Sequence, residues 1–265
     1  MLWYFAMYCL LGGLAGVLAG LLGVGGGIII VPALIFLFNA QHLPAGYILH
    51  LALGTSLASI MFTSISSMRS HHRRGAVDWR IVRGISPGIL AGTFLGSWVA
   101  AQLTTNFLKG FFVIFLYYVG FQMCLNARPK PHRQLPGAAG LFGSGSVIGG
   151  ISSLVGIGGG SMSVPFMLWC NIPLHTAIGT SAAIGFPIAL AGAFGYAING
   201  SAVASLPAGS LGFIYLPALA GICLASVITA PLGVKLAHAL PVPRLKKGFG
   251  VFVLVMATRM LVSLF

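Results

Sequence analysis

Long apolar stretches alternate with short polar or basic segments along the whole chain. A helix needs about 20 apolar residues to cross a membrane. Stretches of about this length run through 2–22, 47–68, 81–102, 107–126, 137–155, 176–198, 208–234 and 248–265. Two shorter apolar stretches, 26–38 and 160–170, each follow a run of glycines. The pattern predicts an all-α polytopic membrane protein with eight to ten membrane helices, including short broken or re-entrant helices after the glycine runs.

The composition agrees with a membrane protein and excludes a soluble one. Hydrophobic residues make up 58% of the chain and charged residues only 6%, whereas about a quarter of a soluble domain is charged. The formal net charge of +13 would indicate a nucleic-acid partner in a soluble protein. Here the basic residues lie in short segments between apolar stretches, where they determine membrane orientation. We therefore expect the lipid bilayer, and no nucleic acid, as a partner.

Two motifs occur twice, in the same order. Gly-x-Gly-Gly-Gly followed by Val-Pro occupies 23–32 and returns at 156–165, and Gly-Thr-Ser occupies 54–56 and returns at 179–181. A duplicated order of this kind predicts two copies of one unit. We place the first membrane repeat at 1–126, a proline-containing linker at 127–136 and the second repeat at 137–265.

Basic residues gather in three loops, 69–80, 127–136 and 237–247. The positive-inside rule predicts that all three are cytoplasmic and that the N-terminus lies outside. The counterpart of the first basic loop in the second repeat is the uncharged segment 199–207, so we predict that the two halves are inserted in opposite orientations. Each half then needs an odd number of crossings. Five helices satisfy this, and so do three spans plus a re-entrant hairpin with the glycines at its tip.

The glycine runs are the first candidate for a substrate-binding site. Glycine disfavours a helix interior by about 1 kcal/mol per residue, and broken backbone inside a membrane must be buried in protein or line a cavity. Helices that begin after the breaks would direct free N–H groups and positive dipole ends at a bound anion. The candidate residues are Gly25, Gly26, Gly27, Gly158, Gly159 and Gly160. The alternative is that the glycines only allow a tight helix crossing.

Hydroxyl side chains near these motifs are the second candidate. Two Thr-Ser pairs would line a polar pathway at matching depth, namely Thr55, Ser56, Thr180 and Ser181. Alternatively, these hydroxyls bond back to carbonyls one turn earlier. Ser161 and Ser163 follow the second break, where the first repeat has Ile28 and Ile30. We interpret them either as the place where an asymmetric substrate is recognised or as helix packing.

Histidines at matching positions are candidates for a proton or anion relay. His50 and His175 stand one helical turn before Gly54 and Gly179, on the same predicted helix face. His238 is a further candidate proton carrier. The alternative is that His50 and His175 cap the helices that begin after a nearby proline.

Asp78 is the single acidic residue of the chain. It lies in a basic loop, where we expect it to pair with neighbouring arginines. A cation exchanger or a metal permease would lack its usual ligands and proton relays without a carboxylate inside the membrane, so an anionic substrate is favoured. The four cysteines are dispersed without metal-ligand spacing, and no carboxylate is present to orient a catalytic Ser-His pair. We therefore expect no metal, no cofactor and no enzyme activity.

These residues resemble a known family. The duplicated Gly-x-Gly-Gly-Gly with its downstream Val-Pro, the duplicated Gly-Thr-Ser, the size and the two-half layout are similar to the TauE/SafE family of sulfite exporters and four-toluene-sulfonate uptake permeases, over residues 10–262. The resemblance implies transport of sulfur-containing anions such as sulfite, sulfonates and sulfoacetate across the bacterial inner membrane. By the same resemblance the motif positions, besides both Gly-Thr-Ser motifs, are Gly23, Gly25, Gly26, Gly27, Pro32, Gly156, Gly158, Gly159, Gly160 and Pro165.

We therefore expect a secondary transporter of small organic or inorganic anions that works by alternating access around a midplane site between two inverted halves. A proton or sodium is the expected coupling ion. Two alternatives stay open. One is a passive anion channel, whose flux would show neither saturation nor counterflow. The other is a non-transporting membrane scaffold whose glycines serve helix packing alone.

Overall fold

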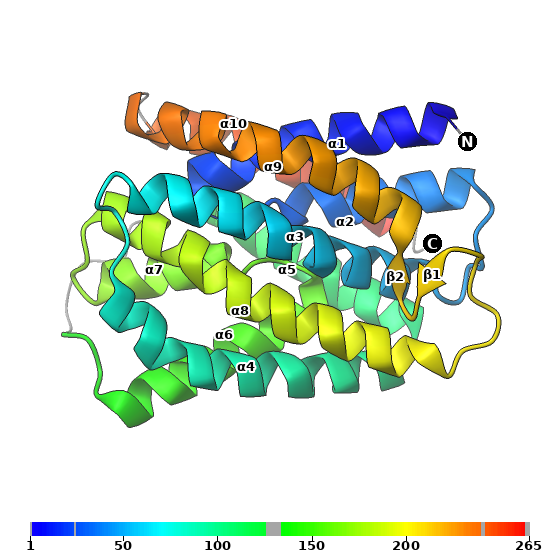
Figure 1. The fold of residues 1–265 in the computed structure, drawn as a ribbon, viewed down its shortest axis with the longest axis horizontal. Coiled ribbons are helices and arrows are strands. Elements are labelled where there is room, and N and C mark those ends of the chain that lie inside the picture. The colour runs from blue at the N-terminus through cyan, green and yellow to red at the C-terminus, as the bar shows by residue number, and fades with distance from the viewer. Residues whose placement is uncertain (1, 24, 126–133, 240–241, 263–265) are drawn as a thin grey trace.

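The computed structural model describes residues 2–23, 25–125, 134–239 and 242–262. Within them the chain forms ten helices and one short β-hairpin (Figure 1). The helices of the first half are α1 Leu2–Leu22, α2 Gly27–Ala40, α3 Ile48–His72, α4 Trp79–Gln102 and α5 Thr105–Cys124. Those of the second half are α6 Ala138–Val155, α7 Gly160–Trp169, α8 Leu174–Ser201, α9 Leu216–Ala239 and α10 Val242–Val262, with strands β1 Ser210–Leu211 and β2 Ile214–Tyr215 between α8 and α9.

Seven helices in the described ranges are long and apolar enough to cross a membrane: α1, α3, α4, α5, α6, α8 and α9. Six of them coincide, apart from a few residues at their ends, with apolar stretches predicted from the sequence. The predicted stretch 208–234 differs, because its first part forms β1 and β2, and α9 begins only at Leu216 and continues to Ala239. The eighth stretch, 248–265, contributes the greater part of α10, which begins earlier, at Val242. The short apolar stretches after the glycine runs form α2 and α7. The predicted all-α polytopic fold is therefore confirmed.

α1 and α2 form a helical hairpin with the first glycine run at its tip. Tyr4, near the start of α1, donates a hydrogen bond from its hydroxyl to the carbonyl of Ala40 at the end of α2, over 3.1 Å. α6 and α7 lie together around the second glycine run, where Val147 and Phe166 line a common groove. Each half therefore begins with two helices joined at a glycine run and continues with three further helices, so that five helices belong to each half within the described residues. The first helix of each pair, α1 or α6, is itself long and apolar enough to cross a membrane.

The two halves pack on each other through equivalent pairs of helices. α1 packs on α9 as α6 packs on α4, and α3 packs on α8. Small residues bring the backbones together: a Cβ at Gly16 would lie 2.5 Å from the carbonyl oxygen of Ser226, and one at Gly149 would lie 2.6 Å from that of Ile89. Figure 1 shows α3 and α8 side by side in opposite directions. This course supports the prediction of inverted halves.

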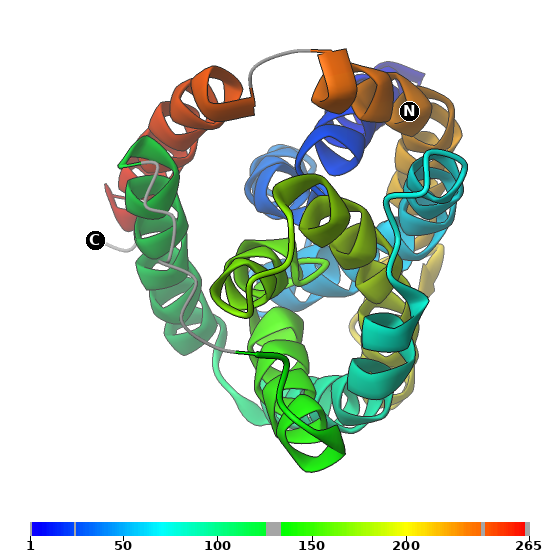
Figure 2. The same ribbon diagram turned by 90° about the vertical axis from the view of Figure 1, so that its left-hand side faces the viewer.

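α5 and α10 pair with each other at one side of the molecule. Figure 2 shows this pair standing beside the other helices rather than between them. The Tyr117 hydroxyl of α5 and the Thr258 hydroxyl of α10 are hydrogen bonded at 2.9 Å. The remaining helices therefore form the packed centre of the molecule, around α3 and α8.

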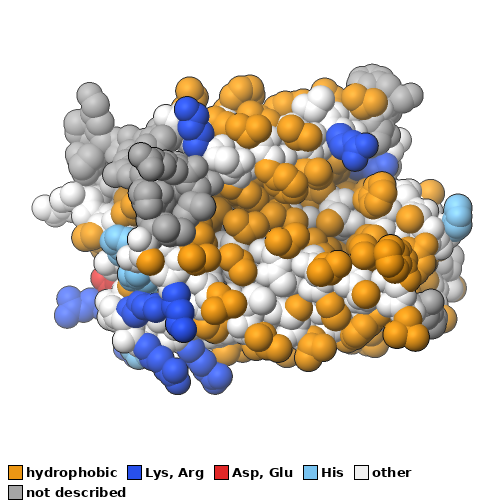
Figure 3. Space-filling view, turned by 90° about the horizontal axis from the view of Figure 1, so that it is seen from above, with side chains coloured by type: hydrophobic (Ala, Val, Ile, Leu, Met, Phe, Trp, Pro, Cys, Tyr) orange, Lys and Arg blue, Asp and Glu red, His pale blue; other side chains and the backbone are white. Residues whose placement is uncertain are grey.

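Charged and histidine side chains gather at one end of the molecule, here called the basic end (Figure 3). It includes the α3–α4 connection with Arg73 and Arg74. The N-terminus lies at the opposite end in Figure 1. This distribution supports the prediction that the basic end is cytoplasmic. Of the other two loops predicted to be cytoplasmic, residues 127–133 and 240–241 lie outside the described residues.

Asp78 caps the start of α4. Its Oδ1 accepts hydrogen bonds from the backbone N–H groups of Arg80 and Ile81, at 2.9 and 3.4 Å. A carboxylate in this place satisfies N–H groups that a helix leaves free and interacts favourably with the positive end of the helix dipole. The hydrogen bonds described for the single acidic residue therefore go to a helix start, and not to the arginine side chains expected from the sequence.

Gly54 and Gly179, the first residues of the two Gly-Thr-Ser motifs, let the backbone of the opposite half approach closely. A Cβ at Gly54 would overlap the carbonyl oxygen of Phe213, in the turn between β1 and β2. A Cβ at Gly179 would overlap the carbonyl oxygen of Ala76, in the α3–α4 connection. The two glycines therefore make equivalent contacts, one at each end of the molecule.

We predict that Gly54→Ala and Gly179→Ala each destabilise the purified protein, because overpacking of a well-packed site costs about 1–3 kcal/mol. Differential scanning fluorimetry in detergent would record this as a lower melting temperature. Gly13→Ala is the matched control, since a Cβ at Gly13 has no neighbour within 4 Å. Unchanged melting temperatures for both motif variants would contradict the close approach.

Candidate functional site

The tips of the two helical hairpins meet between α3 and α8. A Cβ at Gly25 would lie 3.1 Å from the Cα of Gly158, and a Cβ at Gly27 would overlap the carbonyl oxygen of Gly156. The same Cβ at Gly25 would lie 3.1 Å from the side chain of Ile60, midway along α3. The two glycine runs proposed from the sequence are therefore brought into direct contact.

Left-handed backbone at the tips explains why glycine stands there. The φ angles are 77° at Gly25, 79° at Gly26 and 75° at Gly159, a region that residues with a Cβ rarely adopt. Gly26 and Gly159 are the residues directly before α2 and α7. The positive φ angles therefore allow the chain to reverse and to begin a new helix within a few residues.

The starts of α2 and α7 lie at this contact. The first N–H groups of an α-helix have no partner within the helix, and the helix dipole is positive there. α2 begins at Gly27 and α7 at Gly160. Ser161, in the first turn of α7, is 5% exposed, and its hydroxyl has no hydrogen-bond partner among the described residues. A buried unpaired hydroxyl is costly, so a ligand that accepts its hydrogen bond would relieve that cost.

The serines of the Gly-Thr-Ser motifs bind the hairpin tip of the opposite half. Ser56 donates from Oγ to the carbonyl oxygen of Gly156 over 2.7 Å, and Ser181 donates to that of Gly23 over 2.9 Å. Ser163 of α7 is hydrogen bonded to Ser181 at 2.8 Å. Each donation satisfies a carbonyl at the point where the backbone is broken, which matters because a lipid environment offers no water.

The threonines of the same motifs also join the halves. Thr55 Oγ1 accepts a hydrogen bond from the backbone N–H of Tyr215 over 2.9 Å, and Thr180 Oγ1 accepts one from that of Asp78 over 2.9 Å. Each of the four hydroxyls thus has a described partner in the other half, and Ser181 is also bonded to Ser163 of its own half. The alternative in which they bond back to their own helix is not what the structure has.

The two matching histidines lie apart. His50 is 4% exposed, and its Nε2 lies 3.2 Å from the carbonyl oxygen of Ala100, with the ring against Phe213. His175 is exposed at the start of α8 and stacks on His238, with ring centroids 5.1 Å apart. The structure therefore does not bring His50 and His175 into one site, although both stay candidates for a proton or anion relay.

His71 is a buried histidine that the sequence analysis did not single out. It is 1% exposed, and its Nε2 lies 3.0 Å from the carbonyl oxygen of Gly20, near the end of α1. At the spacing that relates the two Gly-Thr-Ser motifs, His71 corresponds to Tyr196. The Tyr196 hydroxyl donates to the carbonyl of Ser153 over 2.9 Å, and Ser153 corresponds to Gly20 at the spacing of the glycine runs. An alignment of the two halves at these two spacings would therefore have singled out His71 from the sequence.

A small enclosed gap lies beside the hairpin tips. It is too narrow for a water molecule, and its lining consists of Ala19, Gly23, Gly25, Ser64, Ser67, Ala182 and Gly185. Ser67 is 1% exposed, and its hydroxyl has no hydrogen-bond partner among the described residues. The gap therefore combines glycine backbone with an unpaired buried hydroxyl, in contact with the first hairpin tip, α3 and α8.

The polar lining continues along α3 but not along α8. Toward the basic end, the buried positions of α3 carry Ser56, Ser59, Thr63, Ser64, Ser67 and His71. The corresponding positions of α8 are Ser181, Ile184, Ile188, Ala189, Gly192 and Tyr196. Beyond the tips, the buried face of α3 is therefore polar, whereas the matching face of α8 is mostly apolar.

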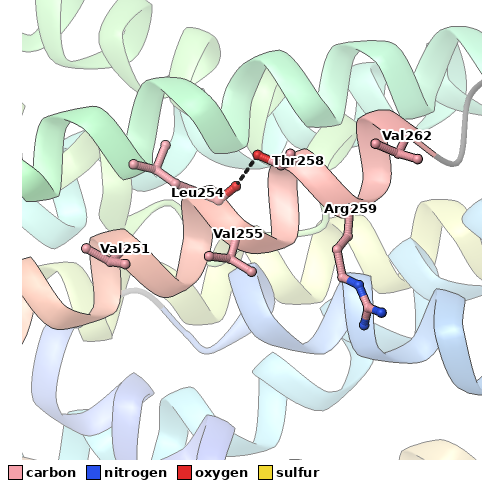
Figure 4. Close-up of a pocket in the computed structure, with 6 residues that line it drawn as sticks. All are labelled: Val251, Leu254, Val255, Thr258, Arg259 and Val262. Atoms are coloured by element: carbon pink, nitrogen blue, oxygen red, sulfur yellow. Dashed lines mark hydrogen bonds between the residues drawn. The ribbon is translucent and has the colours of Figure 1, made fainter.

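A second hollow lies outside the packed centre, along α10. It has a volume of about 450 Å³ and is lined by Val251, Leu254, Val255, Thr258, Arg259 and Val262. Figure 4 shows Arg259 pointing away from α5 into this hollow, with Thr258 on the side of α5. The walls are almost wholly apolar side chains of one helix. Across the described residues, no three His, Cys, Asp or Glu side chains are placed to hold a metal ion.

Comparison with known proteins identifies the family. Residues 8–260 match the family described as Sulfite exporter TauE/SafE. A probable membrane transporter protein of Haemophilus influenzae is 38% identical over 259 residues, which cover 97% of this chain and 98% of that protein. The probable membrane transporter protein YunE of Bacillus subtilis is 30% identical over 216 residues, which cover 74% of this chain and 79% of that protein. No solved structure gives a significant match.

The family match covers nearly the whole described chain, including both hairpin tips and both Gly-Thr-Ser motifs. The relatives named above are described as membrane transporters, and the seven apolar helices agree with such a role. This multi-pass membrane protein therefore belongs to the TauE/SafE sulfite exporter family of membrane transporters.

Proposed function

We propose that the protein is a secondary transporter of small anions, with sulfur oxyanions such as sulfite, sulfonates and sulfoacetate-like molecules as the substrate class. The observation that carries this proposal is the meeting of the two glycine tips, with the unpaired buried hydroxyl of Ser67 in the adjacent gap and that of Ser161 in the first turn of α7. The family name supports sulfur oxyanions within the broader class of anions.

The chemistry around the tips suits an anion. Helix starts at Gly27 and Gly160 supply N–H groups and positive dipole ends, and Ser161 supplies a free hydroxyl. The single acidic residue of the chain, Asp78, lies at the basic end and caps α4. An anion between the tips would therefore meet hydrogen-bond donors without a nearby carboxylate to repel it.

Alternating access follows from the way in which the tips are held. Two equivalent hydrogen bonds, from Ser56 to Gly156 and from Ser181 to Gly23, tie each half to the tip of the other. If either half moves against the other, one side of the gap opens while the tip contact closes the other side. The present gap is closed to water, which suits an occluded state of a transporter better than an open channel. The unpaired hydroxyls of Ser161 and Ser67 argue against a scaffold in which every buried group serves packing.

We predict that a sulfur oxyanion raises the melting temperature of the detergent-purified protein. Sulfite, sulfate, thiosulfate, acetate and methanesulfonate would be compared as sodium and potassium salts, at matched ionic strength. A ligand at a hundredfold its Kd stabilises by about 2.7 kcal/mol, well above a general salt effect. A higher melting temperature with sulfur oxyanions alone supports the substrate class. The same melting temperature with all five anions contradicts it.

We predict that Ser161→Ala weakens the binding of the stabilising anion about tenfold, because one hydrogen bond to a charged group contributes about 1.5–3 kcal/mol. Its melting temperature without ligand should not fall, since this hydroxyl has no partner to lose. Ser163→Ala is the matched control on the same helix: it removes the hydrogen bond to Ser181 and should lower the melting temperature instead. Unchanged affinity in Ser161→Ala would show that the hydroxyl does not contact substrate.

We predict that Gly185→Ala reduces transport by narrowing the gap. A Cβ at Gly185 has ordinary contacts, 3.4 Å from the carbonyl oxygen of Gly158, so the fold can accept the methyl group. Counterflow of radiolabelled sulfite in proteoliposomes would measure the loss. Gly110→Ala on α5, where a Cβ has no neighbour within 4 Å, should keep wild-type counterflow.

Full counterflow in a folded Gly185→Ala variant would place the pathway elsewhere. Non-saturating flux without counterflow in the wild type would indicate a channel.

A further inference from the structure

His71 has one nitrogen in use and one without a partner. Its Nε2 lies 3.0 Å from the carbonyl oxygen of Gly20. A carbonyl can only accept, so Nε2 carries the hydrogen and, in the neutral ring, Nδ1 is the unprotonated nitrogen. Nδ1 is buried and has no hydrogen-bond partner among the described residues. It is therefore a vacant proton acceptor on a side chain that is 1% exposed.

A series of imidazole rings connects this buried nitrogen with the surface of the basic end. The ring of His238, on α9, lies 5.8 Å from that of His71, and the ring of His175, on α8, stacks 5.1 Å beyond it. His238 and His175 are both exposed. Rings at these distances are close enough for water-assisted proton transfer, and histidine is the side chain that exchanges protons near neutral pH.

His71 lies close to residues that line the enclosed gap. It lies one helical turn beyond Ser67 on α3, and Ser67 lines the gap with its unpaired hydroxyl. Its hydrogen-bond partner, Gly20, follows Ala19, which lines the gap as well. The vacant nitrogen and the vacant hydroxyl are therefore neighbours along one helix face, between the hairpin tips and the basic end.

The groups around His71 include a cation but no acidic side chain among the described residues. Arg74 in the α3–α4 connection, His238 on α9 and His175 on α8 interact electrostatically with it, and α1 contributes the carbonyl of Gly20. Arg74 is positive, and no acidic side chain is among these groups. A proton on His71 would thus add positive charge at a buried place beside a cation. An oxyanion in the gap would supply the missing negative charge.

We propose that His71 is the proton-binding site of a proton-coupled anion transporter, with Ser67 as a contact of the anion. This inference rests on the proposed function and names its coupling ion. A proton from water at the basic end passes by way of His238 to the lone pair of Nδ1, and no covalent bond to carbon, sulfur or oxygen changes. The imidazolium and the anion then form a neutral pair, which is less costly to hold inside a membrane than either charge alone.

The second half explains why one such site is enough. Tyr196 holds the carbonyl of Ser153 as His71 holds that of Gly20. A phenol hydroxyl that donates this hydrogen bond has no basic nitrogen and takes up no proton near neutral pH. The fold therefore repeats this structural hydrogen bond in both halves, but the side chain that makes it is protonatable only in the first half.

The test is proton uptake on anion binding. Methanesulfonate is the probe, because a sulfonate stays ionised at neutral pH and brings no proton of its own. Isothermal titration calorimetry of the purified full chain, in buffers of different ionisation enthalpy, measures how many protons are bound with each anion. We expect up to one proton per protein in the wild type. In the pH range in which His71 is neutral before the anion binds, the affinity for methanesulfonate should therefore fall by up to about tenfold for each unit of rising pH.

His71→Gln should bind methanesulfonate without proton uptake and with an affinity that no longer depends on pH. Glutamine keeps an N–H donor for the Gly20 carbonyl but cannot be protonated. His50→Gln tests the competing buried histidine, because His50 also has its Nε2 beside a carbonyl and an unpartnered Nδ1, yet lies against Phe213 and outside the lining of the gap. It should keep the wild-type proton uptake.

The outcomes separate this inference from the proposed function. Binding of methanesulfonate by the wild type without proton uptake, at an affinity independent of pH, overturns the role of His71 and leaves an anion transporter with another coupling ion. Proton uptake that persists in His71→Gln and disappears in His50→Gln moves the proton site to His50. If His71→Gln does not fold, the pH dependence of methanesulfonate binding by the wild type still decides whether a proton is coupled. In that case His238→Gln provides a second test, because it should slow proton uptake in stopped-flow measurements. If no sulfonate or sulfur oxyanion binds, the proposed function fails and this inference fails with it.

Discussion

The constraint on which the rest of the structure depends is that a broken backbone inside a membrane must find its hydrogen bonds within the protein. Each half breaks a helix at a glycine run, and the carbonyls at those breaks are satisfied from the other half, Gly156 by Ser56 and Gly23 by Ser181. Neither hairpin tip is complete without the opposite half. Two kinds of packing between the halves place the tips so that these hydrogen bonds form. Gly54 and Gly179 each approach the backbone of the opposite half closely. In addition, α1 packs extensively on α9, and α4 on α6.

The same constraint creates the place that we propose for a ligand. The first N–H groups of α2 and α7, beside the contact of the tips, have no partner within their helices, and Ser161 adds a buried hydroxyl without a described partner. A protein built only for stability would be expected to pair such groups. In the proposed transporter they lie where the two halves meet, which is the arrangement that alternating access requires. Substitutions at Gly26 or Gly159 would disturb the fold as well as the proposed site, and Gly185 and Ser161 are therefore better tests of function.

The two halves share a fold but differ in chemistry. The tyrosine that holds Ser153 and the histidine that holds Gly20 make the same hydrogen bond, yet only histidine can take a proton. The buried face of α3 beyond the tips is lined by hydroxyls, whereas the matching face of α8 is apolar. A symmetric scaffold with an asymmetric lining gives the substrate a different environment on each side of the tips. Directional coupling needs such a difference, because a pathway with identical sides would release a proton and an anion equally to both.

The sequence by itself determined the membrane class, the seven long helices, the duplication and the importance of the glycine runs. Hydropathy, glycine spacing and repeated motifs are properties of the sequence that can be recognised without knowledge of the tertiary structure. It also pointed to the hydroxyls of Thr55, Ser56, Thr180 and Ser181. Only the tertiary structure decided that these hydroxyls join the two halves, that the breaks lie at hairpin tips, that His50 and His175 lie apart, and that His71, His238 and His175 gather at the basic end. A hydroxyl or an imidazole could bind any of several nearby backbone groups. In this fold the hydroxyls of the two motifs bind residues 100 to 160 positions away, and His50 and His71 bind residues 50 and 51 positions away. That choice is made by packing between the halves, and a single sequence carries no direct record of it.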